Sequence, residues 1–139
     1  MNFARIALAT LGGLVAYFAA GSAIFVLVPQ MIAEGRKYSA LFRSREDMTA
    51  RMPAAMGATL VAILVVAVLY AMAYQGGSGL LHGACFGALI GVFVVFAFVV
   101  HNHVNLNIGL KLTLMQAAAY FVEWTVVGTV IGLLYHPAV

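Results

Sequence analysis

The sequence predicts an all-helical membrane protein that crosses the bilayer four times. Of its 139 residues, 65% are apolar and 8% are charged, whereas soluble globular domains average about 45–50% apolar and about 25% charged residues. Four apolar runs each approach the roughly 20 residues that a helix needs to cross the hydrocarbon core. Most of the charged residues gather in one segment between the first two runs. We therefore expect a single four-helix transmembrane domain over residues 1–139.

The first helix is expected at about residues 6–28. Its apolar run is longer than that of a signal peptide, which has about 7–15 apolar residues, so we expect it to be retained. Pro29 then ends or kinks the helix. Small side chains form one stripe along it, where another backbone can come close: Ala9, Gly12, Gly13, Ala16 and Ala20.

Residues 30–52 form a polar segment. It holds five of the seven Lys and Arg residues of the chain, and anionic lipid headgroups are the partners that these cations predict: Arg36, Lys37, Arg43, Arg45 and Arg51. The sequence from Ser44 to Asp47 has the form of a capping box. A short helix on the membrane surface and a solvated loop are equally good interpretations of this segment.

The second, third and fourth helices are expected at about residues 54–74, 80–100 and 112–135. Pro53 suits the first turn of the second helix. The glycine-rich stretch at residues 75–79 is a turn, so the second and third helices form an antiparallel hairpin. A polar joint at residues 101–111 leads to the fourth helix, which is expected to end at His136 and Pro137.

The positive charges predict the orientation of the chain. Six Lys and Arg residues lie in the polar segment and the joint, and only Arg5 lies on the opposite side. The positive-inside rule therefore places the polar segment and the joint in the cytoplasm and both termini outside. We expect the protein in a bacterial inner (cytoplasmic) membrane. The net charge of +3 reports this orientation, so we expect no nucleic-acid partner.

Glu123 is the main candidate for chemistry, because it lies near the middle of the fourth helix. An ionised carboxylate at the bilayer centre costs about 2.5–3.5 kcal/mol on insertion scales, so we expect it to face the protein interior, to be paired or to be protonated. Gln116 and Tyr120 share its helix face. The group either binds a proton or a cation, or it is a hydrogen-bonded carboxyl group that fixes helix packing. Its partners in that second case are sought among Tyr17, Thr10, Thr59 and Tyr70.

The joint carries a second polar cluster that includes His101, His103 and Asn105. A capped helix end at the interface explains it, and a headgroup-binding or proton-relay role is the functional alternative. Two histidines at i and i+2 diverge on a helix, so a metal site would require the helix to end by about Val100. No Cys, Asp or Glu stands nearby to complete the ligands, and we predict no metal.

Haem ligation is the other cofactor hypothesis. His82 and His101 stand at opposite ends of the third helix, about 28 Å apart at 1.5 Å per residue, so they cannot clamp one ring. His136 could approach His82 on the outer side, but histidine is ordinary at an interface. We therefore predict no cofactor.

Glycines at four-residue spacing predict close helix packing, within the chain or between subunits: Gly83, Gly87 and Gly91 on the third helix, and Gly128 and Gly132 on the fourth. With a further stripe on the first helix, we expect four helices to offer too few faces to cover every small stripe. A homo-oligomer, or an assembly with other membrane subunits, is the resulting prediction.

Motifs of common enzymes are missing: there is no G-x-S-x-G, no Walker loop and no H-E-x-x-H. The first functional hypothesis is a transporter- or channel-like oligomer whose buried protonatable site at Glu123, with Gln116 and Tyr120, is reached from the cytoplasmic joint. An accessory or scaffold subunit that binds other proteins through its glycine stripes is the second hypothesis. A lipid-modifying or cofactor-binding membrane enzyme is the third.

The C-terminal half resembles small bacterial four-helix membrane proteins that are classed only as a domain of unknown function. The resemblance rests on Gly87–Gly91, the Asn-bearing joint, Leu110–Leu112, the pair Ala119-Tyr120 and the Gly128-x-x-x-Gly132 motif. The N-terminal half departs from that family, which usually shows a Trp-Tyr pair where this chain has residues 25–28. The resemblance implies a four-helix fold and no particular activity.

Overall fold

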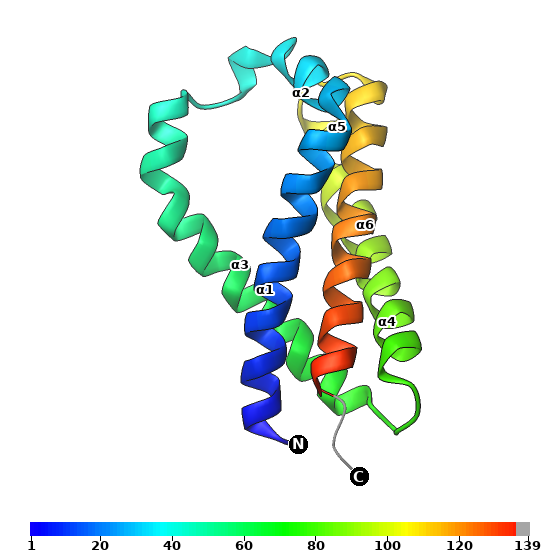
Figure 1. The fold of residues 1–139 in the computed structure, drawn as a ribbon. Helices are drawn as coiled ribbons and strands as arrows, with labels where there is room; N and C mark the ends of the chain where they lie inside the picture. The colour runs from blue at the N-terminus through cyan, green and yellow to red at the C-terminus, as the bar shows by residue number, and fades with distance from the viewer. Residues whose placement is uncertain (136–139) are drawn as a thin grey trace.

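The computed structural model describes residues 1–135, and nearly all of them are helical (Figure 1). Four helices are long and apolar enough to cross a membrane. They are α1 (Phe3–Leu27), α3 (Arg45–Ala73), the run Gly79–Asn105 and α6 (Leu110–Tyr135). The predicted all-helical, four-span fold class is confirmed, and the chain is a multi-pass membrane protein. The orientation of its ends stays a prediction.

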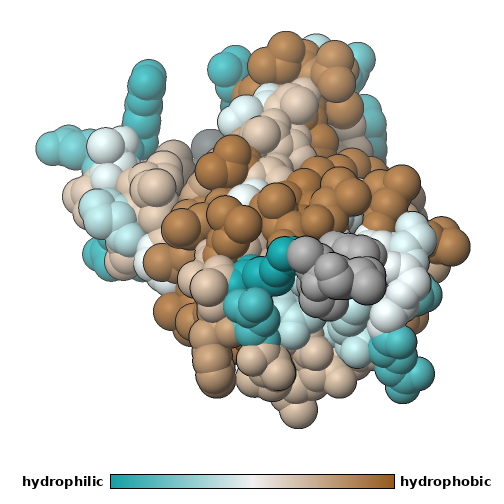
Figure 2. Space-filling model, turned by 60° about the horizontal axis from the view of Figure 1, so that its bottom comes forward, coloured by the Kyte–Doolittle hydropathy of each residue, from teal (hydrophilic) through white to brown (hydrophobic). Residues whose placement is uncertain are grey.

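Helix α6 is the centre of the bundle, because it packs against both α1 and α4 (Gly79–Val94) (Figure 1). The largest fully buried side chains include Ile63 of α3 and Val127 and Ile131 of α6. Hydrophobic side chains cover much of the surface seen in Figure 2, and hydrophilic ones form separate patches. Such a surface suits lipid, since soluble monomers rarely expose large apolar areas.

Glycines bring α4 and α6 into backbone contact. A Cβ added at Gly87 would lie 2.9 Å from the Cα of Gly128, and one added at Gly83 would lie 2.9 Å from the Cα of Gly132. On α1, a Cβ added at Gly13 would lie 2.9 Å from Cγ2 of Ile63. The glycines of α1, α4 and α6 thus all face helices of the same chain. The assumption that four helices cannot cover them is wrong, and the homo-oligomer stays a prediction without that support.

Helix α3 begins nine residues before the predicted residue 54, and Pro53 lies inside it, not in its first turn. The hydroxyl of Ser44 accepts a hydrogen bond of 3.1 Å from the amide of Asp47, and acidic residues in the first turn favour a helix amino terminus. The capping residues therefore start the long helix α3 and not a separate surface helix. Pro53 cannot donate one backbone hydrogen bond, but this loss does not outweigh the stabilisation that the capping contacts give to the helix.

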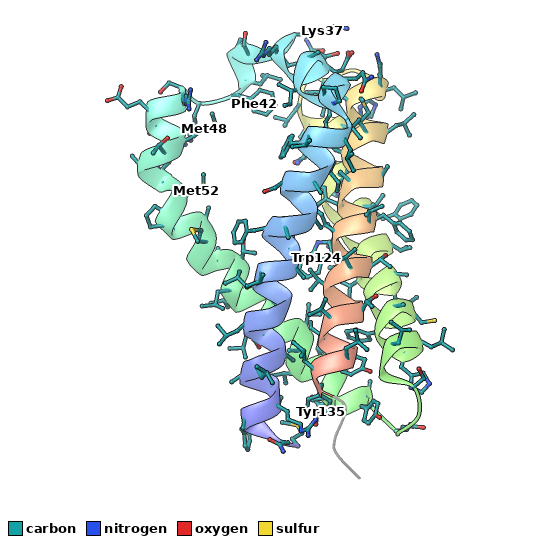
Figure 3. The ribbon with its side chains drawn as sticks, viewed as in Figure 1. Lys37, Phe42, Met48, Met52, Trp124 and Tyr135 are labelled. Carbon is teal, nitrogen blue, oxygen red and sulfur yellow. The ribbon has the colours of Figure 1, made fainter. Side chains whose placement is uncertain are left out.

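Only the second half of α3 packs against the bundle. Its buried residues all lie between Ile63 and Ala71, whereas the first half runs away from α1 and α6 (Figure 1). Met48 and Met52 lie on this separated half (Figure 3) and remain about half exposed, at 46% and 49%. Helix α3 thus diverges from α1 toward the polar segment.

The third predicted helix continues past residue 100. Helix α4 leads through a π-helical turn, η2 (Val95–Val99), into α5 (Val100–Asn105), and the joint shrinks to residues 106–109. The amide of Leu106 still bonds the carbonyl of Asn102, at 2.8 Å. The helix continues through residues 101–105 because no proline or glycine separates them from the apolar run that ends at Val100. The predicted helix end at His136 and Pro137, and an approach of His136 to His82, lie outside the described residues.

The polar segment contains α2 (Pro29–Arg36) and a short 3-10 turn, η1 (Ser39–Leu41). Glu34 of α2 is buried and forms ion pairs with Lys37 at 2.8 Å and with Lys111 of α6 at 3.4 Å. The amide of Gly109 donates a hydrogen bond of 2.9 Å to the hydroxyl of Tyr38. These contacts hold α2 over the start of α6.

Candidate functional site

A cavity of about 340 Å³ lies between α1, α2 and α6. One wall is formed by Gln116, Tyr120 and Glu123 of α6, and the opposite wall comes from α1, including Tyr17 and Gly21. The α6 residues follow the helical period, so they project from one face. The cavity therefore unites the three residues that the spacing places on one side of the fourth helix.

Glu123 is 8% exposed and sits in the interior of the bundle. Of its four possible partners, only Tyr17 lines the same cavity as the carboxyl group. The ring of Tyr17 also packs against that of Trp124, with centroids 5.8 Å apart. This ring contact holds the tyrosine beside the carboxyl group.

The other three possible partners lie away from Glu123. The hydroxyl of Thr10 donates to the carbonyl of Ile6 at 2.8 Å, and that of Thr59 donates to the carbonyl of Ala55 at 3.0 Å. The ring of Tyr70 belongs to an aromatic cluster at the other end of the bundle, which includes Phe86 at 5.4 Å. None of these three residues lines the cavity at Glu123.

Gly21 makes the space for the carboxylate. A Cβ added at residue 21 would lie 2.8 Å from Oε1 of Glu123. Sequence reasoning missed this glycine, because it falls outside the stripe of small residues assigned to the first helix. The adjacent pair of small residues, Gly21 and Ser22, was the available signal, since both line the cavity.

Neutral polar groups surround the carboxyl group. No lysine or arginine from residues 1–135 lines the cavity; its polar side chains are hydroxyls and an amide, apart from Glu123 itself. A charge in such surroundings is costly unless a counter-charge is bound. The site is therefore suited to hold a proton or a small cation on Glu123.

The polar residues of the joint do not belong to this cavity. Nδ1 of His103 lies 2.9 Å from the hydroxyl of Thr113, while His101 and Asn105 are exposed. Because α5 continues through these residues, His101 and His103 project in different directions. The condition for a two-histidine metal site is therefore not met, and within residues 1–135 no three metal-ligating side chains come together.

The Glu123 cavity adjoins a second cavity on the side of α2. Phe25, Met31 and Gln116 line it and also line a second cavity, of about 440 Å³, beneath the polar segment. No residue of the joint lines either space. These cavities give no support to the expected route to Glu123 from the joint, which stays a prediction.

The model of a protein family of unknown function, DUF1761, matches residues 8–132 of this chain. The chain belongs to the DUF1761 family. The match extends across nearly all of the four long helices, including the N-terminal half that the initial resemblance did not cover. It confirms the resemblance to a family of unknown function. No curated protein and no solved structure gives a significant match to this DUF1761 protein.

Proposed function

We propose that this DUF1761 protein is a small membrane transporter that binds a proton or a small cation at Glu123. The observation that carries the proposal is an open volume around a carboxyl group inside an apolar bundle. A carboxyl group that only fixes helix packing needs hydrogen-bond partners and no space. Here Gly21 and Ser22 leave room for several water molecules beside Glu123.

The surroundings of the Glu123 cavity differ toward the two ends of the bundle. The cavity continues toward the polar segment through Phe25 and Met31. Toward the other end of the bundle, Ile63, Val127 and Ile131 are fully buried and close the way. A binding site with one open and one closed side is the arrangement that alternating access requires. With the predicted orientation, this state is open to the cytoplasm.

Protonation changes of Glu123 test the proposal. The chain has only four acidic side chains, so the carboxyl bands of the protein in liposomes can be assigned by infrared difference spectroscopy. We expect one buried carboxyl group to gain and lose its proton between about pH 5 and about pH 9, the range in which coupling groups operate. The band should vanish in Glu123→Gln.

Glu46→Gln is the matched control, because it makes the same chemical change on the exposed first turn of α3. It should leave the band unchanged. A Glu123 carboxyl group that stays protonated over the whole range overturns the proposal. Glu123 would then be a packing group, and the accessory-subunit hypothesis would take its place.

A further inference from the structure

The second cavity forms a groove that shares Phe25, Met31 and Gln116 with the Glu123 cavity but differs from it in chemistry. It lies between the end of α1, α2, η1, the start of α3 and the first part of α6, in the region where α3 diverges from α1. Phe25, Met31, Phe42 and Met48 supply apolar walls. Its volume, about 440 Å³, falls in the range of single-ligand sites, about 300–1,000 Å³. This size favours one lipid chain over a second protein helix.

Two cations line the same groove: Arg36 and Arg43. Arg43 uses Nη1 to bond Asp47 at 2.8 Å, which leaves the rest of its guanidinium group for a ligand. Within residues 1–135, Arg36 has no ion pair. Its neighbour Lys37 differs, because Glu34 already holds its ammonium group at 2.8 Å. The groove therefore carries positive charge, and part of this charge is not paired with an acidic side chain of the described residues.

We propose that this groove binds one anionic phospholipid. An acyl chain lies along Phe25, Met31 and Met48, and the headgroup phosphate lies at Arg36 and Arg43. An apolar groove at the boundary of the bilayer is filled by lipid in preference to water. The guanidinium group suits a phosphate because it offers several donors in a fixed plane. Phe25 and Met31 also line the Glu123 cavity, so a bound lipid would border that cavity, but recognition of the lipid does not require transport at Glu123.

Headgroup selectivity is the first test. Purified, delipidated protein is titrated with short-chain phosphatidylglycerol and with phosphatidylcholine of the same chains, and bound lipid is counted by native mass spectrometry. We expect the preference for phosphatidylglycerol to fall about tenfold in the double variant Arg36→Gln/Arg43→Gln. Arg45→Gln/Arg51→Gln, the matched control, removes two cations that do not line the groove and should keep the preference.

Binding of the acyl chain is the second test, and a substitution at Gly35 provides it. Gly35 lines the groove, and a Cβ added there would have no atom within 4 Å. Gly35→Leu should therefore fill the groove without moving the protein, and binding of both lipids should fall at least about tenfold. Gly57→Leu is the control: a Cβ added there also meets nothing within 4 Å, and residue 57 lies outside the groove.

Each outcome decides the proposal. Equal losses in the two arginine double variants would show that the polar segment attracts anionic lipid diffusely, and would overturn it. So would full binding by Gly35→Leu, or competition by glycerol phosphate without chains as strong as by the lipid. Glu123→Gln should bind phosphatidylglycerol normally, so a failure of the transport proposal is distinguishable from a failure of this one.

Discussion

Gly21 of α1 faces the carboxyl group of Glu123 of α6. A Cβ added at Gly21 would lie 2.8 Å from Oε1 of Glu123, so any other residue at this position would compete with the carboxylate for the same space. The position of the carboxyl group is thus set by two helices that lie about 100 residues apart in the chain.

Gly21→Ala should move the carboxyl group while the protein stays folded, because the displaced atom is the far end of a flexible side chain. We expect a shifted Glu123 infrared band and proton uptake in liposomes that falls about tenfold or more, since small misplacements of a working group are costly. Gly57→Ala, where an added Cβ meets nothing within 4 Å, is the control. An unshifted band and normal uptake in Gly21→Ala would contradict the assigned role of Gly21.

Gly87→Ala should destabilise the pairing of α4 and α6. The added Cβ would meet the carbonyl oxygen of Trp124 and, at 2.9 Å, the Cα of Gly128, and backbone atoms cannot move aside without separating the helices. Overpacking of this kind costs about 1–3 kcal/mol. Denaturation in detergent measures it, with Gly35→Ala as the reference. Equal stability of the two variants would mean that the helices can separate at no cost.

The ion pairs of Glu34 predict a pH dependence for the attachment of α2. The hydrogen bond from Lys37 lowers the pKa of Glu34 below its ordinary 4.5, and the bond to Glu34 raises the pKa of Lys37 above its ordinary 10.5. The Glu34 contribution is therefore present above its ordinary pKa and disappears as the pH falls through the lowered one. The Lys37 contribution is present below its ordinary pKa and disappears as the pH rises through the raised one.

This dependence is measured as the difference in unfolding free energy between the wild-type protein and Glu34→Gln. The difference should be constant near neutral pH and shrink as the pH falls from about 5 to about 3. Glu46→Gln, on the exposed first turn of α3, corrects for the general loss of one acidic group. A difference that does not change with acid pH would contradict a working ion pair at Glu34.

Tyr38→Phe should loosen the short joint before α6. The amide of Gly109 donates to the hydroxyl of Tyr38 at 2.9 Å, and losing one such bond costs about 0.5–1.5 kcal/mol. Hydrogen exchange at the Gly109 amide should speed up roughly two- to tenfold. The amide of Met48, which is bonded to the carbonyl of Ser44 at 2.9 Å, is the internal reference. Unchanged exchange at Gly109 would show that another group protects this amide.

Properties that depend on neighbouring residues were predictable from the sequence. Apolar runs of sufficient length predict the four spans, because hydropathy is a local property and the bilayer has a fixed thickness. The helical period is also a local property, and it correctly placed Gln116, Tyr120 and Glu123 on one face. The form of Ser44–Asp47 correctly indicated a helix start, although not that the helix was the long α3.

Contacts between distant segments were decided only by the tertiary structure. Gly21 and Tyr17 reach Glu123 because α1 packs on α6, and no local pattern selects that pairing among three helices with small residues. The divergence of α3, the second cavity beneath α2 and the mutual packing of Gly87 and Gly128 arise in the same way. Hydropathy indicates which residues are excluded from water. Inside a membrane nearly all residues of a helix are apolar, so hydropathy does not distinguish one helix face from another. Shape and close packing therefore determine which helices pair.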